Sequence, residues 1–282
     1  MAPRAAVPIE RRAFLGAVAG AAAGLARPVA VPTGGGLERI GVQLYTVRDL
    51  LARDFAGTIA RIAEIGYREV EFAGYHGHTP QQVRAVLARH RLAAPSAHVP
   101  FESLEAGWDA MLETAALVGH HYVVVAWVPA ERRGSLDDWR RIADLFNQAG
   151  RACRGAGLQF AYHNQSYEFV PIEGRRPYDV LVEASDAGLV QLELDFFWIA
   201  SGGADPLDYF ARFPGRFPMV HLKDRSAAGD MVDVGRGAIE WRRLFARAAQ
   251  AGIRHYFVEH DEPPAPLHSI RASYAYLKRL TF

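Results

Sequence analysis

Short apolar runs alternate with longer amphipathic stretches from about residue 37 to the C-terminus. Apolar runs rich in β-branched and aromatic residues are typical of buried parallel strands, and the amphipathic stretches are typical of helices that cover them. Strands are expected near Ile40–Tyr45, Glu69–Phe72, Ala93–His98, Tyr122–Trp127, Gln159–His163, Val190–Asp195, Phe217–Lys223 and His255–Glu259. Helices are expected near Phe55–Ile65, Pro80–His90, Leu104–Val118, Leu136–Gly155, Tyr178–Ala187, Pro206–Phe213, Trp241–Gly252 and Leu267–Arg279. This α/β pattern predicts a single (β/α)8 TIM barrel, whose active site lies at the C-terminal ends of the strands.

Several predicted helices run into a glycine just before the next strand. The pairs are Ile65-Gly66, Ala156-Gly157, Ala187-Gly188 and Ala251-Gly252. Glycine readily adopts the left-handed backbone conformation that closes many helices. These positions are therefore predicted to be helix ends.

The first 36 residues have a different pattern. The segment Arg11-Arg12-Ala13-Phe14-Leu15 precedes a Gly/Ala-rich apolar run that ends near Ala26. A basic pair before such a run is typical of an export signal, and the twin arginine favours the Tat route. The alternative is a membrane anchor, but the run is shorter than the roughly 20 residues that span a bilayer. We therefore expect residues 1–36 to be a Tat-type signal and linker, cleaved near Ala30, and residues 37–282 to be a periplasmic or secreted barrel without a membrane span.

Composition narrows the partners and cofactors. The 282 residues include 32 basic and 31 acidic side chains, and this balance gives no electrostatic reason to expect nucleic-acid binding. One cysteine, Cys153, excludes an internal disulfide and a cysteine-rich metal site. Imidazole is the commonest metal ligand, which makes the histidines more informative. Four of them, His76, His78, His120 and His121, are expected to be solvent-exposed, and an oligomer remains open.

Polar side chains follow nearly every predicted strand and should converge on one mouth. In chain order they are Gln43, Tyr45, Arg48, Glu71, His98, Trp127, His163, Asp195, His221, Lys223 and Glu259. Each buried polar group without a partner costs about 1–3 kcal/mol, so a barrel selected for stability alone would not gather them there. The pattern indicates a functional site.

Four of these residues could bind a metal together. His163, Asp195, His221 and Glu259 end strands five to eight, which are neighbours around the barrel. Two imidazoles and two carboxylates suit one divalent ion, and Mn, Mg, Co and Zn all remain open. Taken singly, the aspartate could cap a helix and each histidine could be a structural hydrogen-bonding residue. Their occurrence on consecutive strands favours the metal site.

The motifs resemble the sugar phosphate isomerase/epimerase group of the xylose isomerase-like TIM barrel family. The resembling segments are Gln43-Leu44-Tyr45-Thr46-Val47-Arg48-Asp49, Glu71-Phe72-Ala73-Gly74-Tyr75-His76-Gly77, Tyr162-His163-Asn164-Gln165-Ser166-Tyr167-Glu168-Phe169, Leu194-Asp195-Phe196-Phe197-Trp198, His221-Leu222-Lys223-Asp224, Val234-Gly235-Arg236-Gly237 and Val258-Glu259-His260-Asp261. They follow the family order from residue 40 to the C-terminus.

The resemblance implies that Asp195, His221 and Glu259 hold the metal. Well-known epimerases of the family use a glutamate at the end of strand five as ligand and base, and His163 stands at that position here. This departure puts the usual two-glutamate proton exchange in doubt. Glu168 is a candidate replacement, and the alternative is that it is a solvated loop carboxylate. Gln165 is expected to form hydrogen bonds rather than to bind metal.

Such a site would acidify a C–H group beside a substrate carbonyl and stabilise the enediolate. Glu259 is expected to move the proton as well as bind metal, and Lys223 to bind an oxyanion or sugar hydroxyl. Alternatively, Lys223 forms a salt bridge with Asp224 or Glu193. Substrate-lining positions are predicted at Gln43, Tyr45, Arg48, Glu71, His98, Trp127, Trp198 and Arg236; the two tryptophans could instead be core residues.

The sequence leaves several functions open. A metal-dependent isomerase or epimerase that acts on a carbohydrate is expected first. Arg236 lies where many barrels bind phosphate, but the predicted export favours a free sugar, keto-sugar or glycoside. The alternatives are a metal-dependent lyase or hydrolase of oxidised (3-keto) glycosides and a non-catalytic periplasmic sugar-binding protein. A DNA-repair endonuclease is disfavoured by the neutral charge and the export signal.

Overall fold

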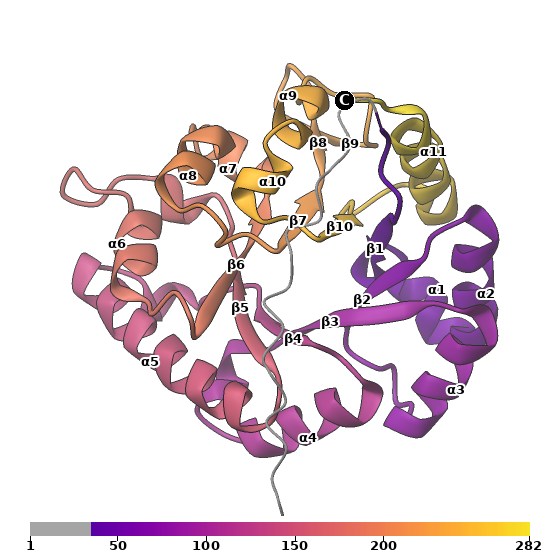
Figure 1. Ribbon diagram of the computed structural model, residues 1–282, viewed down its shortest axis with the longest axis horizontal. Coiled ribbons are helices and arrows are strands. Elements are labelled where there is room, and N and C mark those ends of the chain that lie inside the picture. The colour runs from indigo at the N-terminus through magenta and orange to yellow at the C-terminus, as the bar shows by residue number, and fades with distance from the viewer. Residues whose placement is uncertain (1–34) are drawn as a thin grey trace, which may run out of the picture.

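The computed structural model describes residues 35–282, and these residues form the predicted barrel. Eight parallel strands close in the order β1–β10–β7–β6–β5–β4–β3–β2 (Figure 1). Their bounds are β1 Gly41–Gln43, β2 Glu69–Ala73, β3 Ala93–Val99, β4 Tyr122–Val125, β5 Gln159–His163, β6 Val190–Asp195, β7 Met219–Leu222 and β10 His255–Val258. The predicted single (β/α)8 architecture is confirmed.

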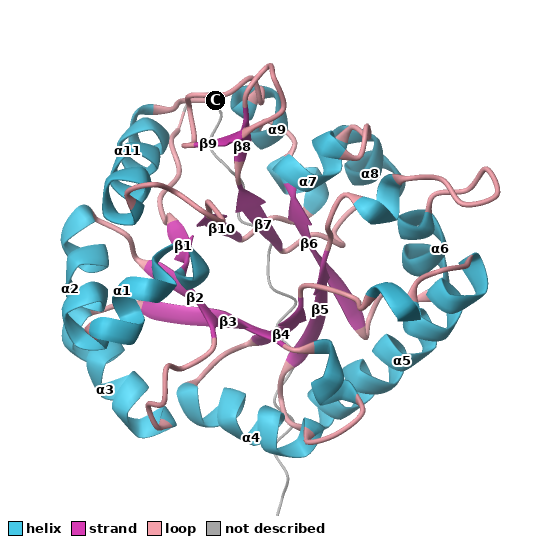
Figure 2. Cartoon of the chain, turned by 180° about the vertical axis from the view of Figure 1, so that it is seen from behind, coloured by secondary structure: helices cyan, strands magenta, loops and turns pink. Residues whose placement is uncertain are grey.

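Helices surround the strands on the outside, as the view from behind in Figure 2 shows. The helices that follow successive strands are α2 Phe55–Ile65, α3 Pro80–His90, α4 Trp108–Val118, α5 Leu136–Gly155, α6 Pro177–Ala184, α8 Pro206–Arg212, α9 Trp241–Phe245 with α10 Ala248–Ala251, and α11 Pro266–Arg279. Apolar side chains from these helices and from the outward faces of the strands make one large buried core.

A small apolar layer fills the inside of the barrel. It consists of Tyr122, Val124, Ala161, Met219 and Phe257. Gly41 has no side chain because the ring of Phe257 occupies the space: a Cβ atom there would lie 2.5 Å from Phe257 Cδ1. Side chains alternate along a strand, so residues further along the same inward faces stand above this floor, towards the strand C-termini. The floor therefore supports whatever lies at the mouth.

Several predicted elements have different bounds, among them the first strand and the helices expected from Leu104 and over 241–252. The first strand ends at Gln43, because the Gln43 side chain accepts a hydrogen bond from Tyr45 N and starts the 3-10 turn η1 Leu44–Val47. The helix expected from Leu104 begins at Trp108, after the 3-10 turn η2 Phe101–Leu104. The helix expected over 241–252 is split into α9 and α10.

Helix ends at glycine are predicted correctly in most cases. Gly66 and Gly252 are the C-caps of α2 and α10, with φ of 122° and 84°. Gly157 follows the C-cap of α5 with φ of 75°. The Gly188 prediction is wrong, because α6 already ends at Ala184 and Gly188 N donates to Asp186 Oδ1 in a side-chain-closed turn.

The structure also contains elements that the hydrophobic pattern does not predict. Two short helices occur here: α1 Arg48–Arg53 follows η1, and α7 Phe196–Ser201 directly follows β6. A small antiparallel hairpin, β8 Asp224–Arg225 and β9 Met231–Val232, follows β7. All three lie after strand C-termini, the end of the barrel where the predicted site residues also lie.

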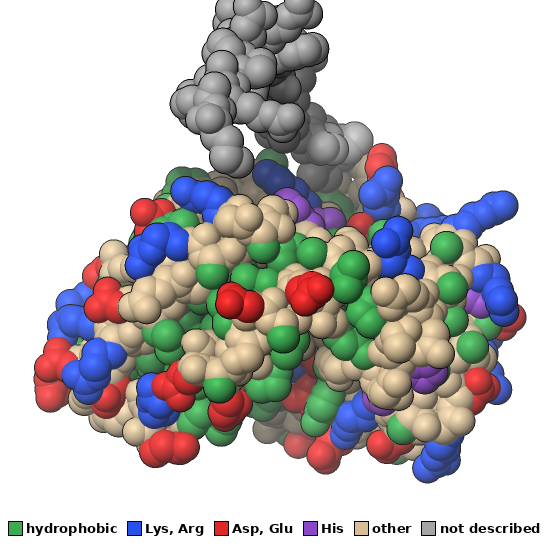
Figure 3. All heavy atoms as spheres, turned by 90° about the horizontal axis from the view of Figure 1, so that it is seen from below, with side chains coloured by type: hydrophobic (Ala, Val, Ile, Leu, Met, Phe, Trp, Pro, Cys, Tyr) green, Lys and Arg blue, Asp and Glu red, His purple; other side chains and the backbone are tan. Residues whose placement is uncertain are grey.

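The predicted export signal lies almost entirely outside the described residues, so it stays a prediction. Where the description begins, Gly35 O accepts a hydrogen bond from Phe282 N, at 3.3 Å. Within 35–282, no helix has the length and apolar character needed to cross a membrane. On the face shown in Figure 3, acidic and basic side chains are interspersed rather than gathered by sign.

Candidate metal centre

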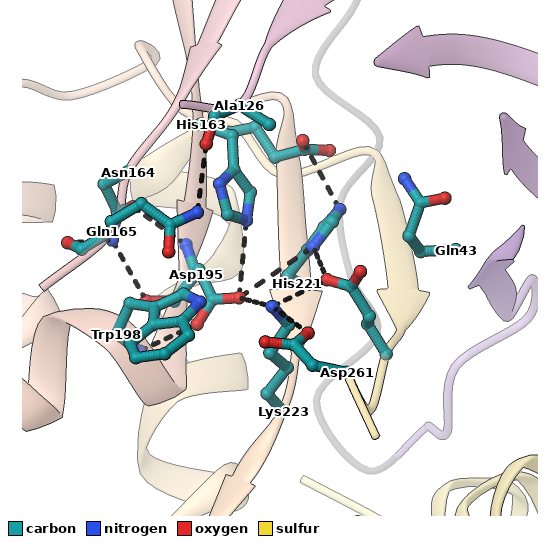
Figure 4. A network of polar contacts seen from close by, with 12 residues as sticks. Gln43, Ala126, His163, Asn164, Gln165, Asp195, Trp198, His221, Lys223 and Asp261 are labelled. Carbon is teal, nitrogen blue, oxygen red and sulfur yellow. Dashed lines mark hydrogen bonds and ion pairs between the residues drawn. The ribbon is translucent and has the colours of Figure 1, made fainter. Parts of the chain in front are cut away.

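The four predicted metal ligands meet inside the mouth of the barrel. His163 Nε2 lies 3.4 Å from Asp195 Oδ2. His221 Nδ1 lies 2.7 Å from Glu259 Oε2 and 3.9 Å from Asp195 Oδ2. One ligand atom from each of the four side chains lies within 4.8 Å of the others, and all four residues are buried. Figure 4 shows His163, Asp195 and His221 pointing towards one another. We call this group the primary cluster.

The hydrogen bonding of the primary cluster fits a metal ion. Among the described residues, neither ring nitrogen of His163 has a hydrogen-bond partner, and Asp195 Oδ2 has none either. The 3.4 Å contact between these two side chains is not aligned as a hydrogen bond. Buried polar atoms without partners cost about 1–3 kcal/mol each, and a divalent cation satisfies two nitrogens and two oxygens together. His163, Asp195, His221 and Glu259 are therefore suited to hold one.

Asp195 combines two roles that the sequence offered as alternatives. Its Oδ1 accepts a hydrogen bond from Trp198 N and caps α7, at 2.8 Å. Its Oδ2 faces the primary cluster. Asn164 fixes the backbone at this point, because Asn164 Oδ1 accepts from Asp195 N at 2.9 Å.

Lys223 lies against the primary cluster, surrounded by carboxylates. Its Nζ is 2.8 Å from Glu259 Oε2, 2.8 Å from Asp261 Oδ1 and 3.3 Å from Asp195 Oδ2. Burial lowers the pKa of Lys223, but the three negative charges outweigh it and raise that pKa. Burial likewise raises the pKa of Glu259, but Lys223 and His221 outweigh it and lower that pKa well below its usual value. The Lys223 ammonium is therefore held in its charged form. The alternative prediction, a salt bridge from Lys223 to Asp224 or Glu193, is wrong, because its partners are Glu259, Asp261 and Asp195.

A second group of side chains lies on the other side of the His221 ring. His221 Nε2 donates to Glu71 Oε2 at 2.6 Å, and Gln43 Nε2 donates to the same oxygen at 2.8 Å. His98 Nε2 lies 2.8 Å from Glu193 Oε2 and 3.2 Å from Glu71 Oε2. Glu71, His98, Glu193 and His221 form a second set of atoms within 4.8 Å of one another, which we call the rear cluster.

The carboxylates of the rear cluster favour protonated imidazoles. Burial lowers the pKa of His98, but Glu71 and Glu193 outweigh it and raise the pKa to about 9. The pKa of His221 is also raised against burial, by Glu193, Glu259 and Glu71. Sequence reasoning did not select Glu193 as a site residue. The available signal was strand alternation, which places Glu193 on the same inward face as Asp195, two residues later.

The predicted substrate-lining residues fall into two sets. Gln43, Glu71 and His98 belong to the rear cluster or contact it. Tyr45 and Trp127 are 40% and 49% exposed, high values for such large apolar side chains. Arg48 lies 4.0 Å from the Tyr45 ring centre and donates to Asp261 O at 2.6 Å.

Trp198 is half-buried, and its ring centre lies 5.4 Å from Lys223 Nζ. The structure thus places Trp198 beside the primary cluster. Arg236 is exposed in the loop after β9, and no ion pair or side-chain hydrogen bond within residues 35–282 joins it to either cluster.

Glu168 belongs to neither cluster. It is fully buried in the 3-10 turn η4 Tyr167–Phe169, where its carboxylate accepts from Tyr162 Oη and, at 2.9 and 3.0 Å, from Gln165 N. Burial raises its pKa to about 7. The alternative of a solvated loop carboxylate is wrong as well. Gln165 forms a hydrogen bond as expected, from its Nε2 to Ala126 O at 2.9 Å.

Three of the four histidines expected to be exposed need correction. His120 is buried rather than exposed, because its Nε2 pairs with Tyr75 Oη at 2.9 Å and its Nδ1 with Ala94 O at 2.7 Å. His76 and His78 are partly covered, and His121 is exposed as expected.

Asp224, the residue after Lys223, holds the loop after β7 in place through hydrogen bonds. It is fully buried, and Gly235 N and Gly237 N donate to its Oδ2 at 2.8 and 3.1 Å. Trp241 Nε1 donates to the same oxygen at 3.2 Å. Gly237 has no room for a side chain, since a Cβ atom would lie 2.2 Å from Asp224 Oδ1.

Comparison with known proteins identifies the family to which this barrel belongs. The chain matches the xylose isomerase-like TIM barrel family over residues 59–280, and it belongs to that family. It is 25% identical over 254 residues to an inosose dehydratase of Geobacillus kaustophilus (strain HTA426), an alignment that covers 74% of this chain and 81% of the relative.

Two solved structures share the fold over most of both chains. A sugar phosphate isomerase/epimerase of Parabacteroides distasonis ATCC 8503 is 24% identical with a TM-score of 0.77, covering 87% of this chain and 99% of the other. The IolI protein, solved with a bound zinc atom, is 15% identical with a TM-score of 0.70, covering 86% and 99%.

Proposed function

We propose that this chain is a divalent-metal-dependent enzyme that enolises a sugar-like hydroxy-carbonyl compound. The primary cluster carries the proposal: four buried N/O ligands with orphaned atoms, at the strand C-termini of a barrel in this family. The IolI protein, which shares this fold, was solved with a bound zinc atom, and this supports a divalent cation in the present chain. A cation held by His163, Asp195, His221 and Glu259 would supply Lewis-acid polarisation of the substrate carbonyl and stabilise developing negative charge.

Side chains of the protein would then remove the proton from the carbon beside the carbonyl and stabilise the resulting oxyanion. Glu259, with its pKa lowered, is ionised at neutral pH and is the candidate base for the C–H beside the carbonyl. The Lys223 ammonium, 2.8 Å from Glu259, stabilises an oxyanion next to the same position. Trp198 and Tyr45 offer apolar ring faces on which a sugar can lie.

We further propose that the enediolate is resolved by elimination: the C–O bond to the substituent on the next carbon breaks, and the proton taken by Glu259 leaves with that oxygen instead of returning to carbon. Strand five ends in His163, so the primary cluster lacks the opposing carboxylate that a two-base proton exchange would use. The inosose dehydratase relative is named for the removal of water, which is an elimination. Isomerisation or epimerisation is the second candidate, favoured by the Parabacteroides structure and by the two carboxylates of the rear cluster.

The substrate class follows from the predicted export. An exported enzyme would meet free sugars, keto-sugars or oxidised glycosides rather than sugar phosphates. The exposed position of Arg236, away from both clusters, agrees with a substrate that carries no phosphate. Activity on sugar phosphates alone would contradict this part of the proposal.

The test is turnover in D2O. The chain, loaded with Mn²⁺, Co²⁺ or Zn²⁺, is incubated with keto-polyols and 3-keto-glycosides and followed by NMR. Loss of water or of the leaving group supports a lyase, whereas deuterium incorporation into an isomerised or epimerised product supports the second candidate. Binding without deuterium exchange or product would refute the enzyme and favour a sugar-binding protein.

Glu259→Gln should abolish exchange. Glu69→Gln is the matched control. Glu69 is also a buried glutamate paired with a histidine, His255, but it lies at the N-terminal end of β2, away from the strand C-termini. Full activity of Glu259→Gln would show that another group is the base.

A further inference from the structure

The rear cluster has the composition of a metal site in its own right. Its four donor atoms are Oε2 of Glu71, Oε2 of Glu193, and Nε2 of His98 and His221. We propose that these side chains bind a second divalent cation, behind the one held by the primary cluster. This proposal concerns binding and stands whether or not the enolising function is correct.

The geometry suits a small tetrahedral ion. Metal–ligand bonds of about 2.0–2.1 Å place tetrahedral ligands roughly 3.3 Å apart. Glu71 Oε2 lies 2.6 Å from His221 Nε2 and 3.2 Å from His98 Nε2. Glu193 Oε2 lies 2.8 Å from His98 Nε2 and 3.3 Å from His221 Nε2. Small outward movements of the side chains would admit an ion.

Hydrogen bonding alone leaves the rear cluster unsatisfied. Two imidazole N–H groups are shared between two carboxylates, and the second oxygens, Glu71 Oε1 and Glu193 Oε1, have no partner among residues 35–282. Both glutamates are fully buried. Buried charges in proteins are paired or coordinate metals, and a dication both neutralises the carboxylates and gives the free oxygens a partner.

The charge around both clusters leads to the same conclusion. Glu71, Glu193, Asp195, Glu259 and Asp261 form one connected set of acidic side chains. Lys223 is the only lysine or arginine paired with this set within the described residues. With one dication in the primary cluster, the negative charges of Glu71 and Glu193 are compensated only by the two imidazoles. A second dication in the rear cluster would neutralise these charges directly.

His221 would join the two sites. Its Nδ1 faces Glu259 and its Nε2 faces Glu71, and its ring stacks on His98 with centroids 5.2 Å apart. Occupation of both sites removes the ring proton that His221 gives to Glu71 and releases it to solvent. Since three of the four rear residues are fully buried, the second ion would fix the charge and position of His221 rather than touch substrate.

The donor set indicates which cation to use. Two imidazole nitrogens and two carboxylate oxygens suit Zn²⁺ or Co²⁺ better than Mg²⁺, which prefers oxygen ligands and retains water. Co²⁺ is also a convenient probe, because its visible absorption reports the coordination geometry.

The test counts ions on the full chain. The protein is stripped with a chelator, dialysed against excess Co²⁺ or Zn²⁺, freed of loose metal, and measured by elemental analysis and by Co²⁺ absorption. We expect about two ions per wild-type chain. Glu193→Gln and His98→Ala should each retain one, with the rear-site absorption lost, whereas Glu69→Gln should retain two.

Saturation of the wild type at one ion, or at none, would overturn the proposal without any variant. Two ions in the wild type that persist in both Glu193→Gln and His98→Ala would also overturn it, because the second ion would then lie elsewhere. Circular dichroism of each variant checks that it is folded. Two bound ions without turnover on any sugar would leave this inference standing and refute the proposed function instead.

Discussion

Single side chains in this mouth use their two polar atoms for different purposes. Asp195 caps α7 with Oδ1 and faces the primary cluster with Oδ2, and His221 contacts acidic groups through both ring nitrogens. A residue type at a strand end therefore does not decide between a structural and a functional role, since one residue can fill both. Substitutions that keep one atom and change the other separate the roles.

Asp195→Asn should preserve the helix cap and weaken the metal site. The asparagine oxygen still accepts from Trp198 N, so the thermal midpoint without metal should change little, whereas Asp195→Ala should cost about 1 kcal/mol more through loss of the cap. Metal affinity should fall at least about tenfold in both variants. Calorimetric titration and thermal unfolding measure these effects. Undiminished affinity in Asp195→Asn would show that Asp195 is only a cap.

Glu168 should make stability depend on pH. Its folded-state pKa of about 7 exceeds the unfolded value near 4.5, so the folded state binds more protons between these values. The contribution of Glu168 to the free energy of unfolding is therefore fully present below about pH 4.5. It is lost as pH rises through 7, by at most about 3 kcal/mol. Urea unfolding of wild type and Glu168→Gln from pH 5 to 8 checks this. Parallel pH profiles for the two proteins would contradict it.

At the scale of elements, the strands and their inward residues are what the sequence predicts best. Buried parallel strands are continuous apolar runs, so their ends, and with them the primary cluster, can be located from the pattern. The pattern does not predict α1, α7 or the β8–β9 hairpin, because these elements are too short to show a hydrophobic period, and α7 is started by the Asp195 side-chain cap. Glu193 and Asp224 were not predicted, because their roles are set by side-chain contacts that the hydrophobic pattern does not specify.

The loop after β7 should depend on Asp224. Asp224→Ala leaves the partly buried N–H groups of Gly235 and Gly237 and the buried Trp241 indole without their acceptor, a loss of about 2–4 kcal/mol in unfolding free energy. Asp230→Ala, in the exposed turn of the same hairpin, is the control and should change stability by less than about 0.5 kcal/mol. Urea denaturation distinguishes them. Equal stability of the two variants would mean that the loop is held by other contacts.

At the scale of the whole molecule, the fold and family agree with the sequence prediction, because barrel topology follows from the repeated strand–helix alternation. Chemistry is less predictable at this scale, since the chain is similar both to a protein described as an isomerase/epimerase and to one described as a dehydratase. In the proposed function, the identity of the product would depend on how protons and leaving groups are placed after enolisation, and the primary cluster would determine only the first step.

Export remains a prediction about the complete chain. Replacing Arg11 and Arg12 with lysine should retain the protein inside a bacterial host, because Tat recognition requires the arginine pair, while the wild type should reach the periplasm. Cell fractionation with immunodetection measures the distribution. Equal periplasmic amounts of both proteins would contradict the Tat route.

The most direct test of the central claim is the metal content of the purified chain, measured for wild type, His163→Ala and Glu259→Gln. The account predicts that the wild type retains at least one divalent ion per chain and that both variants retain less. A wild type that carries no metal, and whose thermal stability does not change on addition of Mn²⁺, Co²⁺ or Zn²⁺, would contradict it and leave the mouth of the barrel as a binding site without metal chemistry.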